Sequence, residues 1–343
     1  MRSLLGSVLT LLPSQDRGNP LSCPRTPGIL DPRAEFRGFI RPRIWGFTQE
    51  PSSLEIIEFE HRSRRDRRKD GRMRLDYFQD FQALESNKFF LIAGPCVIES
   101  RDHTLFMAEA LKKITTEHEI PFIFKASFDK ANRSSINSFR GPGINEGLKI
   151  LNEVRKTFDV PILSDIHEAP QAIFAGAILD VIQIPAFLCR QTDLLVAAAK
   201  TGKIINVKKG QFLSPAEMKN VVDKLREAGN EKIFLTERGS SFGYNNLVVD
   251  FRSIPIMKSF GYPVIFDATH SVQLPGAGKD KSSGQPEFIP TLASAAIATG
   301  ADGLFMEVHN DPSKALSDGA NALNLRVLPT LLDRLIRIRQ VVN

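Results

Sequence analysis

The sequence predicts an α/β protein with the fold of a (β/α)8 TIM barrel, preceded by an N-terminal extension that we expect to be disordered. From residue 89 onward, short apolar runs rich in β-branched residues alternate with helical patterns, as in proteins built from repeated βα units. Eight such units fit into residues 73–343, close to the ~250 residues that this barrel commonly takes. An open, doubly wound sheet would place a G-x-G-x-x-G turn after its first strand, whereas this chain has Gly94-Pro95-Cys96 there.

The predicted strands are separated by stretches that leave room for a helix. They cover residues 89–93, 122–126, 161–165, 181–185, 204–208, 232–237, 264–268 and 303–308. Helical patterns cover residues 104–119, 144–158, 192–201 and 215–228, and an amphipathic segment over residues 326–342 ends the chain. The helix over 215–228 has the clearest start, because Ser214 can cap it, Pro215 suits its first position and Glu217 follows early.

Composition excludes several classes of protein. With 42% hydrophobic and 24% charged residues, the 343-residue chain is an ordinary globular protein, and no apolar run approaches the ~20 residues of a membrane-spanning helix. Its three cysteines, Cys23, Cys96 and Cys189, are too few and too scattered for a disulfide framework. We therefore expect a cytoplasmic protein with reduced cysteines and no membrane partner.

Residues 1–72 differ in character from the catalytic barrel predicted over residues 73–343. They hold 14 Lys and Arg against 9 Asp and Glu, whereas the rest of the chain holds 31 against 30. The basic tract at residues 61–70 could bind nucleic acid. We favour a disordered tail or a misassigned start, with the true start at Met73, and we expect no nucleic-acid partner because the barrel is nearly neutral. The first twelve residues weakly resemble a signal peptide, but no small-residue cleavage site follows.

Polar and reactive side chains follow the predicted strands in order. They are Cys96, Lys125, Asp165 with His167, Gln183, Lys208 with Lys209, Arg238, His270, and Glu307 with His309. In a closed parallel barrel the carboxyl ends of all strands meet at one face, which carries the active site. The sequence therefore predicts an enzyme whose site lies at this face.

Five cations would converge at this face: Lys125, Lys130, Arg133, Lys208 and Arg238. Like charges packed together repel unless an anion lies between them, and Arg and Lys are the usual ligands of phosphate. The set indicates a ligand with more than one phosphate, or with a phosphate and a carboxylate. The polar loop after the second strand adds Asn132 and Ser134, which suit a phosphorylated ligand with many hydroxyl groups.

A second group of side chains offers one sulfur, one imidazole and two carboxylates: Cys96, His270, Glu307 and Asp318. This mixed set suits Zn²⁺, Fe²⁺ or Mn²⁺ better than Mg²⁺ or Ca²⁺. The spacing alone leaves another interpretation open, in which Cys96 is a buried apolar residue and His270 a core histidine. The glycine-rich loop over residues 276–284 is either a lid over the site or a plain surface loop.

Several segments resemble the 3-deoxy-D-manno-octulosonate 8-phosphate synthase family. They are residues 93–100 (AGPCVIES), 125–135 (KASFDKANRSS), 139–143 (FRGPG), 180–193 (DVIQIPAFLCRQTD), 206–209 (NVKK), 236–239 (TERG) and 266–271 (FDATHS). The resemblance runs from about residue 89 to the C-terminus and includes none of residues 1–72. It implies condensation of phosphoenolpyruvate, D-arabinose 5-phosphate and water to the eight-carbon sugar-acid phosphate and phosphate, for the lipopolysaccharide core.

The resemblance also implies roles for individual residues. Phosphoenolpyruvate would be held by Lys130, Gln183, Lys208, Arg238 and the backbone of Ala186. Arabinose 5-phosphate would be held by Asn132, Arg133 and Ser134, with Lys125 near both substrates and Asp165 supporting the site. In the homotetramer that the family forms, Phe187 and Arg190 would reach a neighbouring subunit's site.

One class of this family has Asn where this chain has Cys96 and needs no metal. The other class has Cys there and binds a divalent ion through Cys, His, Glu and Asp, which here are Cys96, His270, Glu307 and Asp318. The resemblance therefore implies a bound Zn, Fe or Mn ion. It does not assign the general base, for which His270 and an ion-bound water are both candidates. The alternative is 3-deoxy-D-arabino-heptulosonate 7-phosphate synthase, which uses erythrose 4-phosphate. The loop KANRSS at 130–135 argues against it, because that family typically has Lys-Pro-Arg-Thr-Ser there.

Overall fold

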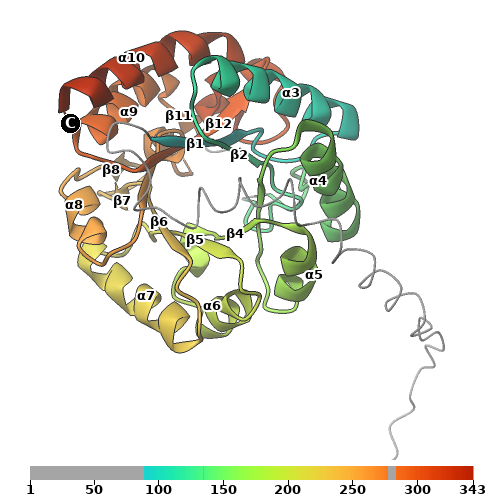
Figure 1. Ribbon diagram of the computed structural model, residues 1–343, viewed down its shortest axis with the longest axis vertical. Helices are drawn as coiled ribbons and strands as arrows, with labels where there is room; N and C mark the ends of the chain where they lie inside the picture. Colours follow the sequence, from blue (N-terminus) through green and yellow to red (C-terminus); the bar gives the residue numbers. More distant parts are fainter. Residues whose placement is uncertain (1–88, 134, 277–282, 343) are drawn as a thin grey trace, which may run out of the picture. The chain divides into compact units, whose positions relative to one another are not determined.

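A computed structural model describes residues 89–133, 135–276 and 283–342. Eight parallel strands of this part close into a barrel, because β12 pairs with β1 and every other strand pairs with its neighbours (Figure 1). In order around the barrel they are β1 (Phe90–Gly94), β2 (Phe122–Lys125), β3 (Ile162–Asp165), β4 (Val181–Ile184), β5 (Ile204–Lys208), β6 (Ile233–Glu237), β9 (Val264–Asp267) and β12 (Gly303–His309). The predicted (β/α)8 barrel is confirmed.

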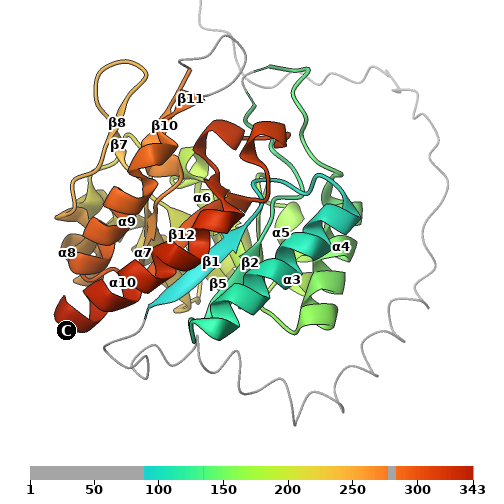
Figure 2. The same cartoon turned by 90° about the horizontal axis from the view of Figure 1, so that it is seen from above.

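The helices surround the barrel, as Figures 1 and 2 show. In the described part they are α3 (Arg101–Glu117), α4 (Ile144–Phe158), α5 (Gln171–Ile178), α6 (Thr192–Ala199), α7 (Met218–Glu227), α8 (Ser253–Lys258), α9 (Ile289–Ala298) and α10 (Leu328–Val342). Two small hairpins stand in the loops after β6 and β9: β7 (Ser240–Ser241) with β8 (Leu247–Val248), and β10 (Gln273–Leu274) with β11 (Ser283–Gly284). The short strand β13 (Leu323–Asn324) pairs with the end of β12.

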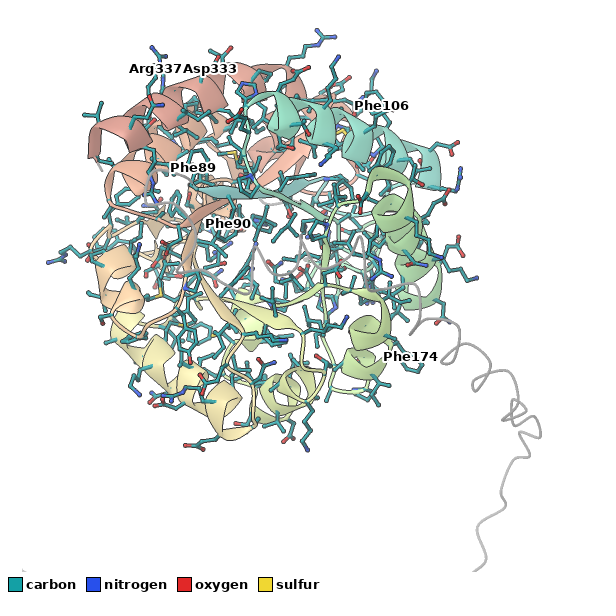
Figure 3. The ribbon with its side chains drawn as sticks, viewed as in Figure 1. Phe89, Phe90, Phe106, Phe174, Asp333 and Arg337 are labelled. Carbon is teal, nitrogen blue, oxygen red and sulfur yellow. The ribbon has the colours of Figure 1, made fainter. Side chains whose placement is uncertain are left out.

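Two apolar layers hold the barrel together. The larger one lies between the strands and the helices, and the smaller one fills the inside of the barrel with Phe90, Ile92, Ile123, Leu163, Val181, Ile204, Phe234, Ile265 and Phe305. Figure 3 shows Phe90 inside the ring of strands, whereas Phe106 and Phe174 lie on the surrounding helices α3 and α5. Gly303 is part of this packing, since a Cβ there would come within 2.7 Å of the Phe90 ring.

The differences from the predicted elements have simple causes. Pro161 and Pro185 fall just outside β3 and β4, as expected for residues that cannot donate to a strand ladder. The capping box at Ser214 and Glu217 is present, with a 3-10 turn, Pro215–Glu217, leading into α7. Three helices had no amphipathic signal: α8 has six residues, and α5 and α9 are apolar on most sides.

Some predictions concern residues outside the described part. These are the extension over residues 1–72, the alternative start at Met73, Ser134 and most of the loop over 276–284. Among the described helices, none combines the length and the apolar character needed to cross a membrane.

Candidate active site

The strands carry a polar layer directly above the apolar interior, because every second residue of a strand faces the same side. The residue two positions after an interior apolar residue is polar in seven strands. These residues are Lys125, Asp165, Gln183, Asn206, Thr236, Asp267 and Glu307, and Lys208 lies two positions beyond Asn206 in the same strand. All eight are buried. In β1 the same level is taken by Gly94, where a Cβ would overlap the carbonyl oxygen of Lys125. The sequence alternation therefore builds a charged floor at the carboxyl ends of the strands.

A pocket opens above this floor and collects most of the predicted residues. Its lining includes Lys125, Lys130, Asn132, Arg133, Asp165, Gln183, Ala186, Phe187, Lys208, Arg238, His270 and Asp318. Arg190 is not among the lining residues; it is exposed, and its carbonyl accepts a hydrogen bond from Lys224. Lys209 points away from Lys208, and its buried ammonium lies 3.4 Å from Glu237, so only one of these two lysines serves the pocket.

The lysines of the pocket are paired with buried carboxylates. Lys125 Nζ donates to Glu307 Oε1 and to the Cys96 carbonyl, at 2.8 Å each. Lys130 Nζ lies 3.5 Å from Glu307 Oε1 and 4.0 Å from Asp165 Oδ2. Lys208 Nζ donates to Asp267 Oδ2 at 2.7 Å and lies 3.7 Å above the centre of the Phe305 ring.

Arg238 is bonded differently. Within the described residues its guanidinium makes one side-chain hydrogen bond, from Nη2 to Gln273 Oε1 at 3.0 Å, while buried Nη1 has no partner. Burial lowers the pKa of this guanidinium, and Asp267 and Glu237 raise it again from a distance. Arg238 lines the pocket, and a buried cation with an unpartnered N–H group beside a pocket is suited to bind an anionic ligand.

The carboxylates of the floor remain ionised at neutral pH. Burial alone would raise the pKa of Asp165, but the charges of Lys125 and Lys130 outweigh it and lower that pKa. The same balance of burial against Lys125, His270 and Lys130 holds the pKa of Glu307 well below its usual value. Burial is also outweighed at Asp267, whose pKa is lowered mainly by His270 and Lys208.

A chain of hydrogen bonds crosses four strands and ends on Asp165. Thr236 Oγ1 donates to Asn206 Oδ1 at 2.6 Å, and Asn206 Nδ2 donates to Gln183 Oε1 at 2.9 Å. Gln183 Nε2 then donates to Asp165 Oδ1, while Ser127 Oγ donates to Asp165 Oδ2 at 2.6 Å. Every donor points toward the carboxylate, so the chain fixes the Gln183 amide and favours ionised Asp165.

Replacing Asp165 with asparagine is expected to lower the free energy of unfolding by about 2 kcal/mol at pH 7. Asparagine would present an N–H group to Gln183 or Ser127, both of which donate to this position. The folded pKa of Asp165 is lowered, so its stabilising effect is present above about pH 4 and is lost as the pH falls below that value. Urea unfolding between pH 7 and pH 3 should therefore show a steeper loss of stability in the wild type. If stability fell equally with pH in the wild type and in the variant, this expectation would be wrong. The control is Glu109→Gln, which removes the charge of an exposed carboxylate on α3.

The four predicted metal ligands converge at the side of the pocket formed by β1, β9 and β12. Ligand atoms of Cys96, Glu307 and Asp318 all lie within 4.8 Å of one another, and Cys96 Sγ is 3.4 Å from Asp318 Oδ2. His270 Nε2 lies 3.6 Å from Glu307 Oε1 and 3.9 Å from Asp318 Oδ2. Residues separated by up to 222 positions are thus brought together by closure of the barrel.

The protonation and bonding of these groups suit a divalent ion. His270 Nδ1 lies 2.8 Å from Asp267 Oδ2, so in the neutral ring the proton belongs on Nδ1 and the lone pair of Nε2 is available to a ligand, an arrangement common in metal sites. Glu307 Oε2 is buried and has no hydrogen-bond partner among the described residues. Burial and then Glu307 raise the pKa of the Cys96 thiol, and an ion would displace the thiol proton.

Some residues of the site were not predicted. Asn206, Thr236 and Asp267 lie in phase with the predicted residues of their strands, so strand alternation could have identified them. Ser317 had no comparable signal; its hydroxyl accepts from Arg133 Nη1 at 2.8 Å and lies 3.0 Å from Cys96 Sγ. Arg133 Nη1 is also 3.2 Å from Asp318 Oδ1, so Arg133 joins the loop after β2 to the loop after β12.

The fold and the site define a (β/α)8-barrel enzyme of the class that binds phosphorylated substrates at the carboxyl ends of its strands. The chain belongs to the DAHP synthetase I family, whose sequence model matches residues 74–342. A protein of Koribacter versatilis is 64% identical over 258 residues, which cover 74% of this chain and 92% of the relative. A Trichlorobacter lovleyi protein is 64% identical over 252 residues, with 74% and 93% covered, and a Synechococcus protein is 58% identical over 252 residues, with 74% and 89% covered. All three bear the name 2-dehydro-3-deoxyphosphooctonate aldolase.

Proposed function

We propose that this chain condenses phosphoenolpyruvate with D-arabinose 5-phosphate and water, giving 3-deoxy-D-manno-octulosonate 8-phosphate and phosphate. This is the reaction of the enzyme that the relatives' name denotes, and its product belongs to the synthesis of the lipopolysaccharide core. The observation that carries the proposal is the placement of cations on opposite sides of one pocket. Lys208 ends β5 and Arg238 follows β6, whereas Lys130 and Arg133 follow β2, which is three strands from β5 and four from β6 in the ring of eight.

The first side suits phosphoenolpyruvate. Arg238 offers the free Nη1, and Lys208 offers an ammonium group held by Asp267. Gln183 and Ala186 lie in the same lining, and Lys130 reaches this ligand from the other side. The second side suits the aldose phosphate, with Asn132 and Arg133 as its ligands and Ser134 as an implied third. Two anionic substrates held in this way would face each other across Lys125. Their mutual orientation would supply much of the rate enhancement.

The chemistry joins C3 of phosphoenolpyruvate to the aldehyde carbon of the sugar, and the aldehyde oxygen gains a proton. C2 thereby becomes electrophilic, and water adds to it and loses a proton. The bond between C2 and the phosphate oxygen then breaks, which releases phosphate and leaves the keto group at C2. A divalent ion, Zn, Fe or Mn, held by Cys96, His270, Glu307 and Asp318, would supply Lewis-acid polarisation at this point. With Nδ1 bonded to Asp267 and Nε2 directed at the other ligand atoms, His270 serves as a ligand rather than as the base that takes the water proton.

The same proposal includes a homotetramer in the cytoplasm. Phe187 lines the pocket while 56% of its surface is exposed, as expected for a rim residue that a neighbouring subunit covers. Arg190 follows on the same exposed turn. Cys96 and Cys189 are free thiols, which suits a reducing compartment.

Comparison of two aldose phosphates tests the proposed substrate. With phosphoenolpyruvate fixed, kcat/KM for arabinose 5-phosphate is expected to exceed that for erythrose 4-phosphate by at least about a hundredfold, because a site that binds hydroxyl groups rejects an analogue lacking one of them. Release of phosphate and formation of the keto acid measure the reaction. An equal or greater value with erythrose 4-phosphate would assign the chain to the heptulosonate synthase instead.

A further inference from the structure

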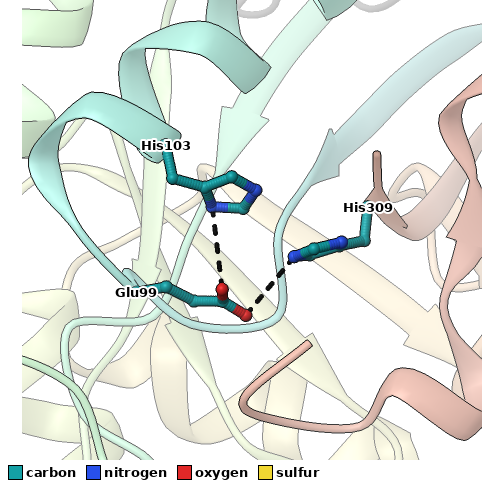
Figure 4. A group of neighbouring side chains, drawn as sticks. All are labelled: Glu99, His103 and His309. Atoms are coloured by element: carbon teal, nitrogen blue, oxygen red, sulfur yellow. Dashed lines mark ion pairs between the residues drawn. The ribbon is translucent and has the colours of Figure 1, made fainter. Parts of the chain in front are cut away.

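A second cluster of titratable side chains lies outside the pocket, where the loop after β1 leads into α3 (Figure 4). It consists of Glu99, His103 and His309. His309 Nε2 lies 3.4 Å from Glu99 Oε1, and His103 Nδ1 lies 4.0 Å from Glu99 Oε2. Figure 4 shows both rings directed at the one carboxylate, and their centres are 4.6 Å apart.

The composition of the cluster resembles a metal site, but its hydrogen bonds oppose that interpretation. His309 Nδ1 accepts a hydrogen bond from the Asp311 amide at 3.0 Å, which places the proton of the neutral ring on Nε2. A protonated nitrogen has no lone pair for a metal. His309 therefore directs its Nε2 N–H group toward Glu99 Oε1 at 3.4 Å, although this atom completes no hydrogen bond within the described residues. The cluster is thus two imidazole rings grouped around one carboxylate rather than a set of metal ligands.

Glu99 has a further partner that links it to the catalytic pocket. Its Oε1 accepts the Leu316 amide at 2.8 Å, and the next two residues are Ser317 and Asp318, which contact Cys96 Sγ at 3.0 and 3.4 Å. Cys96 itself precedes Glu99 by three residues in the loop after β1. The Glu99 carboxylate thus joins the two loops that carry Cys96 and Asp318.

The backbone of the segment around Asp318 has few other contacts that would fix its position. Asp318 has a φ of +48°, in the left-handed region that most non-glycine residues avoid and that aspartate adopts more readily than most. The segment 310–318 has no strand or α-helix to fix it apart from the 3-10 turn Pro312–Lys314. The Leu316 amide lies two residues before Asp318, close enough to restrict the position of its carboxylate.

We propose that Glu99 is a positioning residue, which fastens the loop after β12 to the loop after β1 and thereby holds Asp318 at ligand distance from Cys96. The inference rests on the proposed metal centre. It makes the hydrogen-bond acceptor of Glu99 essential and its negative charge dispensable. In Glu99→Gln the carbonyl oxygen can still accept from the Leu316 amide, and the new N–H group would face His103 Nδ1, which is buried and has no hydrogen-bond partner among the described residues.

Divalent-ion affinity and amide exchange test the proposal. Zn²⁺ is titrated into chelator-stripped protein, and exchange of the Leu316 amide is followed by mass spectrometry in the ion-free protein. Glu99→Ala, and Glu99→Asp, whose side chain is too short to reach Leu316, are expected to bind Zn²⁺ about 10- to 100-fold more weakly and to exchange this amide faster. Glu99→Gln is expected to stay within about threefold of the wild type, as is the control Glu109→Ala on the exposed side of α3.

Each other outcome has a separate meaning. Unchanged affinity and unchanged exchange in Glu99→Ala and Glu99→Asp would overturn the positioning role. Two ions per wild-type chain, with one lost in Glu99→Gln, would overturn it in favour of a metal site at the cluster. If the wild type binds no ion, the proposed metal centre fails, and exchange of the Leu316 amide still decides whether Glu99 fastens the loop. Should Glu99→Ala not fold, the comparison of Glu99→Asp with Glu99→Gln gives the same decision.

Discussion

Replacing Arg238 with methionine is expected to lower kcat/KM for phosphoenolpyruvate by about a thousandfold, equivalent to about 4 kcal/mol. The guanidinium would be a main partner of the ligand's anionic groups, because Arg238 lines the pocket and its buried Nη1 has no hydrogen-bond partner among the described residues. A charge-assisted bond in a water-poor site is worth more than a surface contact, and methionine keeps the apolar volume while removing the donor. Steady-state assays with varied phosphoenolpyruvate measure the effect.

The same substitution is expected to leave the ligand-free protein at least as stable as the wild type. Arg238 is buried with one hydrogen bond to Gln273, and no ion pair to it is formed by the described residues. Burying a cation without a partner is unfavourable, so its removal relieves a cost. Phosphoenolpyruvate should raise the unfolding midpoint of the wild type and not that of the variant.

Arg155 provides the matched control. It is a half-buried arginine outside the pocket that donates to the Ile178 carbonyl and lies 3.7 Å from Asp180. Arg155→Met should lose stability and keep kcat/KM. If Arg238→Met behaved like Arg155→Met, Arg238 would be a structural residue and the assignment of the β5–β6 side to phosphoenolpyruvate would be wrong.

The strand pattern allowed much of the barrel to be predicted, because the period of two persists beyond the apolar interior. Once Ile123 and Leu163 are inside, Lys125 and Asp165 must also face inward. The same rule separates Lys208 from Lys209, which had been grouped at the end of one predicted strand. Helices α5 and α9 lacked a signal because apolar residues cover most of their surface, and periodicity cannot then show which side is buried.

The pairing of charges could not be predicted from the strand pattern. Sequence order indicates that five cations reach one face, but it does not show that Lys125 and Lys208 are bound to buried carboxylates while Arg238 keeps a free N–H group. These differences depend on side-chain length and on which strands are neighbours. Likewise, Cys96 and Asp318 are 222 positions apart, and only closure of β12 onto β1 brings them into contact.

Removal of divalent ions with a chelator is expected to lower turnover of the wild type by at least about a hundredfold, and added Zn²⁺, Fe²⁺ or Mn²⁺ should restore it. We expect this loss because one thiol, one imidazole and two carboxylates, which together can bind a divalent ion, lie close together at the side of the pocket next to β12. Metal content must be measured alongside turnover. Full turnover of protein shown to be free of metal would remove the ion from the reaction.

Cys96→Asn separates a ligand role of the thiol from a structural one. The side chain is almost fully buried and touches Ser317 and Asp318, and asparagine can hydrogen-bond to both. The variant is therefore expected to fold, to bind the ion weakly and to show turnover that depends less on added metal. Cys189→Ala, which removes a buried thiol outside the pocket, should keep the chelator sensitivity of the wild type. Loss of cooperative unfolding in Cys96→Asn would instead make the thiol a packing residue, because a ligand that acts only through the ion can be exchanged without disturbing the ion-free fold.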